Sequence, residues 1–220
     1  MPEIFTLDDA NVDAAVKLIA RGVAEIPLYQ WLLGEHVDDE EKCEWLAELL
    51  LRPLQRVGCV VGAREEGRLV GVLVWQPHDV NLSPDGQPPI TPADVAVAAQ
   101  TPGLRERLAN LWTTQPLPLP VEDAVCCVLS VVEPKYRGGP MLYDMTVKVE
   151  DFCHENDRPF YCWTGSSHVR DWFVRGWGAM VFDTREWEGR PMYGLVTERP
   201  PRRGVASAER RAAVPASATT

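Results

Sequence analysis

A short turn between two apolar segments holds the residues whose types and spacing most clearly suit chemistry. Arg137, Gly138 and Gly139 lie between a continuous apolar run over residues 124–132 and a segment with helical spacing over residues 140–155. A continuous apolar run is typical of a strand buried on both faces, so we expect strand, turn and helix in that order. Such a turn points backbone N–H groups outward, and the helix start adds about half a positive charge. We therefore expect a phosphate or pyrophosphate site, although paired glycines in such turns also occur for packing reasons alone.

Several polar side chains near this turn could orient a substrate or move a proton. Glu133 directly follows the apolar run and could act as a base, alone or through a water molecule; a solvated turn carboxylate is the alternative. His168 begins another helical segment, where its neutral form is favoured, and could act as a base; a surface capping role is the alternative. The polar candidates are Cys127, Ser130, Glu133, Tyr161, Thr164, Ser166 and His168.

The cysteines do not follow a metal-binding pattern. They stand at positions 43, 59, 126, 127, 153 and 162, without CxxC pairs or zinc-finger spacing. Cys126 and Cys127 are neighbours, so they face opposite sides of a strand and cannot easily hold one metal ion together. The acids at positions 38–41 are typical of a helix N-terminus and need no metal ion beside His36 to explain them. We expect buried, reduced thiols and no metal site.

Composition limits the classes of function. The chain has 220 residues and a formal net charge of −10, from 22 basic and 32 acidic residues. This charge opposes binding to nucleic acids and to anionic membranes, but it allows a local anion site. No apolar run reaches the roughly 18 residues of a membrane span, and the start, MPEIFTLDDAN, shows no signal-peptide pattern. These features predict a cytoplasmic globular protein.

Hydrophobic periodicity predicts the elements that must hold these candidates in place. Helices are expected over residues 9–25, 38–52, 91–112 (with a break near Pro102 and Gly103), 140–155 and 168–176. Strands are expected over residues 57–63, 68–76, 124–132, 160–164, 179–187 and 192–198, and an apolar loop or short turn over 27–37. The order predicts one mixed α/β domain over residues 1–199, with an insertion over 77–120 and a disordered tail over 200–220.

The central segments also resemble a known superfamily. The stretch from Val128 through Pro134 and Arg137-Gly138 into the helix, followed by FYCWT and WFVRGWGAMVF, resembles the GNAT acyltransferases. The likeness spans about residues 4–198 and is closest for members similar to puromycin N-acetyltransferase. It implies a GNAT fold of α/β (α+β) class, with a central mixed, mostly antiparallel sheet, a splayed central strand pair and flanking helices. It also implies transfer of an acetyl or other acyl group from acyl-CoA to a primary amine of a small molecule, and a possible homodimer.

The resemblance assigns roles to individual residues. Coenzyme A would be held at Val131, Val132, Arg137, Gly138, Gly139, Met141, Leu142 and Tyr143. The amine would lie near Tyr29, Trp31, Trp163 and Phe173, where an aromatic floor suits an apolar or aromatic amine and ordinary core packing is the alternative. The catalytic groups would be Glu133, Ser130 and His168. Acetyl-CoA or another acyl-CoA would be the co-substrate, and no metal ion is implied.

Three residues depart from the family pattern and leave other hypotheses open. Pro140 and Leu142 occupy its two later glycine positions; proline has no N–H, and leucine places a side chain where bare backbone would approach the ligand. Phe173 occupies the position of a tyrosine that protonates the leaving thiolate in many members. The second hypothesis is therefore a GNAT-fold protein with a degenerate coenzyme A site, which uses another acyl carrier, catalyses another reaction, or binds a ligand or partner. An unrelated α/β domain with a regulatory or scaffold role is the third.

Overall fold

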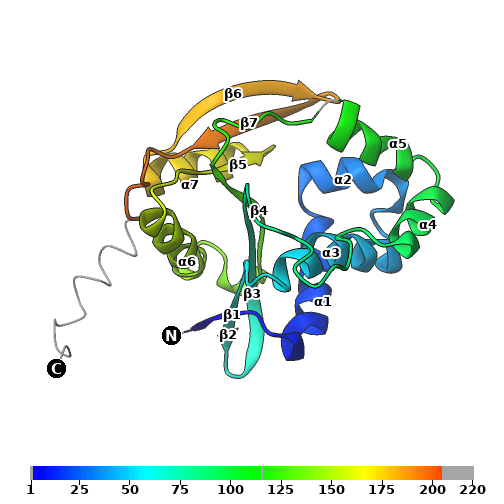
Figure 1. Ribbon diagram of the computed structural model, residues 1–220, viewed down its shortest axis with the longest axis horizontal. Coiled ribbons are helices and arrows are strands. Elements are labelled where there is room, and N and C mark those ends of the chain that lie inside the picture. The colour runs from blue at the N-terminus through cyan, green and yellow to red at the C-terminus, as the bar shows by residue number, and fades with distance from the viewer. Residues whose placement is uncertain (1, 115, 205–220) are drawn as a thin grey trace.

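One seven-stranded sheet organises the chain. The computed structural model describes residues 2–114 and 116–204. The strands follow the order β1-β2-β3-β4-β5-β7-β6 (Figure 1). Only β4 and β5 run parallel, and the other neighbours are antiparallel, so the expected mixed, mostly antiparallel sheet is confirmed. The strands are β1 (Glu3–Thr6), β2 (Val60–Glu65), β3 (Arg68–Pro77), β4 (Val125–Val132), β5 (Phe160–Thr164), β6 (Met180–Trp187) and β7 (Arg190–Val196).

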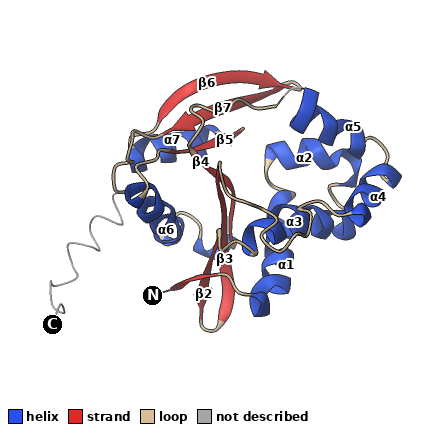
Figure 2. Cartoon of the chain, in the orientation of Figure 1, coloured by secondary structure: helices blue, strands red, loops and turns tan. Residues whose placement is uncertain are grey.

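Helices cover both faces of this sheet. They are α1 (Val12–Val23), α2 (Pro27–Leu33), α3 (Glu40–Gln55), α4 (Pro92–Gln100), α5 (Leu104–Ala109), α6 (Met141–Glu155) and α7 (Ser167–Trp177). In Figure 2, α6 and α7 lie on one side of the central strands and α1 to α5 on the other. The sequence marks several helix starts, since the side chains of Asp39, Thr91 and Ser166 accept hydrogen bonds from the first turns of α3, α4 and α7. The break expected in the insertion separates α4 from α5.

The prediction of a loop or short turn over residues 27–37 is wrong for the first part of that range, which forms α2. Pro27 suits the first helical turn, and Gly34, with φ of 59°, ends the helix. Arg107 then donates hydrogen bonds to the carbonyl oxygens of Leu32 and Leu33, at 2.6 and 3.0 Å. A seven-residue helix is too short to show clear periodicity, and its stability comes from these tertiary contacts. Strand β1 was also missed, because four residues give too little alternation.

The two central strands separate soon after they begin. β4 pairs with β5 only at Val125 with Phe160 and at Cys126 with Tyr161. Beyond these pairs β4 continues to Val132 and β5 to Thr164. The backbone edge of β4 that faces β5 is therefore open along most of the strand. The splayed central pair expected from the resemblance is confirmed.

A β-bulge in β4 lies at the point where the strands separate. Val74 of β3 pairs with Leu129 and the next residue, Trp75, pairs with Cys127, so Val128 is an extra residue on β4. A bulge reverses the alternation of the strand that holds it. Beyond it the N–H of Glu133 donates to the Val70 carbonyl of β3 at 2.9 Å. Since successive N–H groups alternate between the two edges of a strand, those of Val132 and Ser130 point toward the open edge.

The first residues of the expected tail pack against α6. The Gly204 N–H donates to the buried Glu150 carboxylate at 3.0 Å, and Arg203 pairs with Asp151 at 2.7 Å. The prediction of disorder from residue 200 is therefore wrong for residues 200–204. It relied on the low content of apolar residues, which gives no sign of the two polar contacts. Residues 205–220 of that prediction lie outside the described residues.

Candidate functional site

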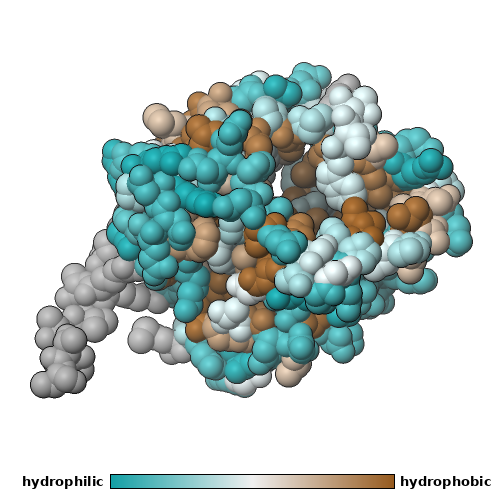
Figure 3. Space-filling view, in the orientation of Figure 1, coloured by the Kyte–Doolittle hydropathy of each residue, from teal (hydrophilic) through white to brown (hydrophobic). Residues whose placement is uncertain are grey.

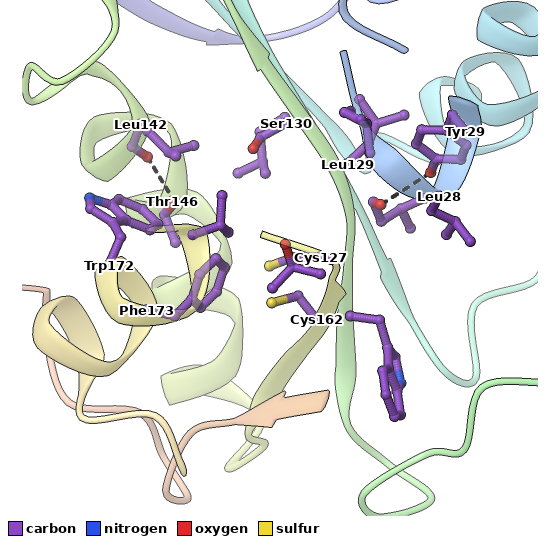
Figure 4. Close-up of a pocket in the computed structure, with 17 residues that line it drawn as sticks. Leu28, Tyr29, Cys127, Leu129, Ser130, Leu142, Thr146, Cys162, Trp172 and Phe173 are labelled. Carbon is purple, nitrogen blue, oxygen red and sulfur yellow. Dashed lines mark hydrogen bonds between the residues drawn. The ribbon is translucent and has the colours of Figure 1, made fainter. Parts of the chain in front are cut away.

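A mostly apolar cavity occupies the space between the separating strands. This splay cavity has a volume of about 120 Å³ and opens partly to solvent. Figure 4 shows Ser130, Leu142 and Thr146 on one side of β4, and Leu28, Tyr29 and Leu129 on the other. The thiols of Cys127 and Cys162 and the ring of Phe173 lie at its centre. The walls come from α2, β3, β4, α6, β5 and α7, so the cavity passes through the sheet.

A second cavity, of about 300 Å³, lies between the strands and α2, α3 and the segment that follows α5. Figure 3 shows a hollow with hydrophobic walls in this region of the surface. The two cavities share the lining residues Leu28, Tyr29, Cys127, Val128 and Trp163. The two compartments thus share one wall, an arrangement that would bring two bound reactants close together.

Tyr29 is the polar side chain at that wall. Its ring is buried, and its hydroxyl donates a long hydrogen bond, 3.4 Å, to the carbonyl of Val128 (Figure 4). Burial raises the pKa of Tyr29 above its ordinary value, because the phenolate would lose its hydration. The hydroxyl is therefore protonated at neutral pH and available as a proton donor.

The thiols at the centre of the splay cavity are poor nucleophiles. Burial raises the pKa of Cys127 and of Cys162, because it disfavours their thiolates. Neither is near a described cation that would reverse this effect. Among the described residues no cluster of His, Cys, Asp and Glu could hold a metal ion.

The turn before α6 meets some of the requirements for a pyrophosphate. Gly138 has φ of 76° and a Cβ there would meet no atom within 4 Å, so its backbone faces open space. A Cβ at Gly139 would make only an ordinary contact, 3.6 Å from the Tyr136 carbonyl. The first N–H groups of α6, at Met141 and beyond, have no partner within the helix. Pro140, at the N-cap, removes one donor from this set.

The Arg137 guanidinium is already occupied by partners within the protein. It forms a two-point ion pair with Glu25, at 2.6 and 3.1 Å, and its Nε donates to the Val132 carbonyl at 2.8 Å. The hydrogen bonds from Arg137 lower the pKa of Glu25. A phosphate that engaged Arg137 would have to share it with this carboxylate. The backbone of the turn therefore suits a pyrophosphate, whereas its one arginine, Arg137, is only partly available to it.

The other residues expected to hold coenzyme A have mixed positions. Leu142 lines the splay cavity, whereas Val131 packs on Gly22 of α1. Met141 lies buried beneath Gly71 of β3. Tyr143 lies outside the cavity and stacks on Trp172 and Trp177, with ring centroids 4.6 and 5.0 Å away.

Two of the three residues expected to be catalytic lie outside both cavities. The Glu133 carboxylate accepts two hydrogen bonds from Arg68, at 3.1 and 2.8 Å, and lies 3.8 Å from Arg21. The carboxylate is therefore engaged by two arginines and lines neither cavity, and its role as a base stays a prediction. His168 is exposed in the first turn of α7 and lines neither cavity. Ser130 does line the splay cavity.

The residues expected to bind the amine divide between the compartments. Tyr29 and Trp163 line both cavities, and Phe173 lines only the splay cavity. Trp31 lines neither and packs edge-on against Trp187, with ring centroids 5.6 Å apart. Trp31 is therefore part of a small satellite core, as the packing alternative allowed.

The sequence interpretation missed several residues that line these cavities. In the second cavity they are Leu32, Leu50, Gln76, Leu111, Trp112, Pro116 and Leu117; in the splay cavity they include Thr146, Cys162 and Val169. Four of them belong to the segment over 77–120, for which the sequence predicted an insertion with a broken helix but no individual lining residues. Their one signal was the apolar content of LWTT and QPLPLP, which is unusual for a connector.

The comparisons agree with this architecture. No protein-family model matches the chain, and no curated protein sequence matches it. A structure from Corynebacterium glutamicum, described as histone acetyltransferase HPA2 and related acetyltransferase, is 15% identical. Its TM-score is 0.61, and the match covers 93% of this chain and 98% of that one. Polyamine N-acetyltransferase from Drosophila melanogaster, which forms N-acetylagmatine, is 16% identical, with a TM-score of 0.58 over 89% and 99%. The PaiA N-acetyltransferase of Thermoplasma acidophilum, solved with coenzyme A, is 10% identical, with a TM-score of 0.51 over 88% and 98%.

At these identities the likeness establishes the fold, which is that of the GNAT acetyltransferases, as the sequence resemblance implied. The closer likeness to puromycin N-acetyltransferase is not tested by these structures and stays a prediction. In the described part of the chain, no helix is long and apolar enough to cross a membrane.

Proposed function

We propose that this protein transfers an acetyl or other acyl group from acyl-CoA to the primary amine of a small molecule. The single observation that supports the proposal most directly is the pair of cavities at the splayed strands, one between the strands and one beside α2 and α3, which share the lining residues Tyr29 and Cys127. The thioester would enter the splay cavity from the α6 side, and the amine would occupy the second cavity. Both reactants would then reach one wall, where the bimolecular step becomes effectively unimolecular.

The open edge of β4 supports the chemical step. Its outward N–H groups, at Ser130 and Val132, are suited to polarise the thioester carbonyl and to stabilise the oxyanion that forms there. The amine first releases its ammonium proton to solvent, its nitrogen lone pair then forms a bond to the carbonyl carbon, and the carbon–sulfur bond breaks. The leaving thiolate takes the hydroxyl proton of Tyr29, and the nitrogen returns its surplus proton to that oxygen. Tyr29 thus supplies the proton that Phe173, in the family's usual position, cannot supply.

The comparisons support this proposal at the level of reaction class. The neighbours reported above are named acetyltransferases; one acts on polyamines and one was solved with coenzyme A. The cytoplasmic location, the possible homodimer, and the absence of nucleic-acid and membrane partners stay predictions from the sequence.

A specific observation favours a second candidate function. Pro140 has no backbone N–H, so the turn offers one hydrogen-bond donor fewer, and Arg137 forms an ion pair with Glu25. A protein that had stopped using coenzyme A would show these features. In that case the same cleft would accept another acyl carrier or another ligand.

A thermal-shift titration with acetyl-CoA and with free coenzyme A separates the two candidates. At 100 times the dissociation constant, binding adds about 2.7 kcal/mol to the free energy of unfolding. For a chain of this size each kcal/mol raises the midpoint by roughly 2–4 °C, so we expect a saturable rise of about 5–10 °C. No shift at millimolar coenzyme A would reject the proposal and favour the second candidate.

A matched pair of variants tests the turn itself. Gly139→Glu places a charge and bulk where the pyrophosphate would lie, whereas Gly139→Ala adds only a methyl group at an unstrained position. We expect Gly139→Glu to weaken coenzyme A binding at least about tenfold relative to Gly139→Ala in calorimetry. Equal affinities would remove this turn from the coenzyme A site.

A further inference from the structure

We infer that the amine accepted by the second cavity is a monocation with a flat apolar body, such as an arylalkylamine, and that dicationic polyamines are excluded. The inference rests on the proposed function, because it assumes that the second cavity holds the acceptor. It goes further by naming the acceptor's chemical class from the walls of that cavity.

The walls of the second cavity are mostly apolar, although Gln76, Tyr29 and Tyr161 also line it. Its volume, about 300 Å³, lies at the lower end of the range for small-ligand sites. Leu32, Leu50, Leu111 and Leu117 approach from four different segments. None of the described residues that line the cavity carries a charge. A second ammonium group buried there would lose its hydration without gaining an ionic partner.

Aromatic rings frame the same space. Trp112 lines the cavity while 44% of its surface stays exposed, so a large ring stands at the opening. Trp163 is fixed in place because its indole N–H donates to the Pro118 carbonyl at 3.0 Å. This bond also holds the connector that contains Leu117 over the cavity. A ligand with a planar apolar body gains offset or edge-to-face contacts with such rings.

The polar groups give the ligand a direction. The Tyr29 hydroxyl and the backbone of Val128 lie at the wall that both cavities share. An amine must reach this wall to attack a thioester in the splay cavity. Its apolar body then extends toward Leu111, Leu117 and Trp112. The remote end of the acceptor therefore lies among leucine and tryptophan side chains, where a second charge would be unpaired.

The overall charge of the protein does not explain a preference for a monocation over a dication. The net charge of −10 attracts cations of every kind to the surface. A dication such as agmatine would be attracted more strongly than 2-phenylethylamine by that general field. The cavity must therefore provide the discrimination itself, which a binding comparison at physiological salt can measure.

The experiment compares these two amines on the full chain by isothermal titration, with and without saturating coenzyme A. We expect 2-phenylethylamine to bind roughly 10- to 100-fold more tightly than agmatine, which is the range for burying one unpaired polar group. Turnover of both amines with acetyl-CoA is followed by mass spectrometry of the products.

Three variants locate the effect. Leu117→Glu adds a carboxylate to the wall at a half-buried position that the fold can tolerate, and should reduce the preference for 2-phenylethylamine at least about tenfold. Leu119→Glu makes the same change two residues further on, at a side chain that is 43% exposed and does not line the cavity, and should leave the preference unchanged. Trp112→Ala should weaken 2-phenylethylamine binding by about tenfold without lowering the unfolding midpoint.

The outcomes separate the inference from the function on which it rests. Equal or tighter agmatine binding, acetylation of agmatine in preference to 2-phenylethylamine, or no binding of either amine overturns the inference, even when acetyl-CoA binds and transfer occurs. Selective 2-phenylethylamine binding that Leu117→Glu reduces and Leu119→Glu does not supports it. Failure of the proposed function appears separately, as the absence of any coenzyme A response.

Discussion

The phenolic oxygen of Tyr29 lies 3.4 Å from the carbonyl oxygen of Val128, the residue that bulges out of β4. The contact joins the second helix to the strand edge where both cavities meet. Its length leaves the hydroxyl proton weakly held by its present partner. This relationship places a proton donor at the wall between the two compartments.

Replacing Tyr29 with phenylalanine should slow the chemical step while preserving the fold. The ring still fills its buried position, so the loss of stability should stay near 1 kcal/mol. The loss of general-acid catalysis should lower kcat by about 10²-fold, with a smaller change in KM. Steady-state kinetics on acetyl-CoA and an accepted amine provide the measurement. An unchanged kcat would show that Tyr29 is not the proton donor.

The pH dependence of the wild-type rate tests the same residue. Burial raises the pKa of Tyr29 above the ordinary value of 10.0, so the donating, protonated form persists to higher pH than in a free tyrosine. We therefore expect no fall in kcat attributable to this hydroxyl up to pH 10. A Tyr29-dependent decline that begins near pH 8, absent in Tyr29→Phe, would contradict this environment.

Changing Glu133 to glutamine should leave the pH profile of the rate intact. The carboxylate is committed to Arg68 and Arg21 and lines neither cavity. The Arg68 side chain is 63% exposed, so loss of this pair should lower stability by less than about 1 kcal/mol. A shifted acidic limb of the kcat profile in Glu133→Gln would restore the glutamate as the base.

Changing Glu25 to glutamine should strengthen coenzyme A binding. It releases Arg137 from the two-point ion pair and removes a carboxylate beside the turn. We expect a gain in affinity of roughly three- to tenfold by calorimetry at low ionic strength. Glu48→Gln makes the same change in net charge in the Arg52 pair on α3 and serves as the control. A weaker or unchanged affinity in Glu25→Gln, relative to the control, would mean that Arg137 does not reach the ligand.

Removing the buried Glu150 side chain should destabilise the protein strongly. Its carboxylate accepts hydrogen bonds from the Trp177 indole at 2.5 Å and from the Gly204 N–H at 3.0 Å. Glu150→Ala leaves both buried donors without this acceptor, and we expect a loss of about 3 kcal/mol in urea unfolding. Glu155→Ala, on the exposed face of the same helix, should change stability by less than about 0.5 kcal/mol. Equal losses in both variants would show that the Glu150 contacts do not stabilise the fold.

Periodicity was sufficient for every strand of the sheet except β1, and the resemblance indicated the splay between the two central strands. The apolar run ending at Val132 and the following glycines are local signals, and the pattern of a strand, turn and helix depends only on them. The same run contains Ser130, which lines the splay cavity, whereas the role of Tyr29, which lines both cavities, came from the resemblance. Elements with long, regular periodicity were therefore placed correctly.

What could not be predicted depends on partners that are distant in the chain. Arg68 is 65 residues from Glu133, and Glu25 is 112 residues from Arg137, so no local pattern shows that these charges are paired. Helix α2 is stabilised by Arg107, again from a remote segment. Residues of the insertion also line the second cavity. Their closeness to α2, α3 and the strands results from the whole fold and has no local signal in the sequence.

The extra residue at Val128 has a consequence for how this chain tolerates changes in length. Deleting Val128 would remove the extra residue and restore regular pairing with β3. Cys127 would keep Trp75 as its partner, but the edge of β4 would lose the offset that coincides with its divergence from β5. The loops over 77–120 accept added or lost residues far more easily, since their ends are already joined by the sheet. Relatives of this protein should therefore vary in length between β3 and β4, and keep the length of β4 itself constant.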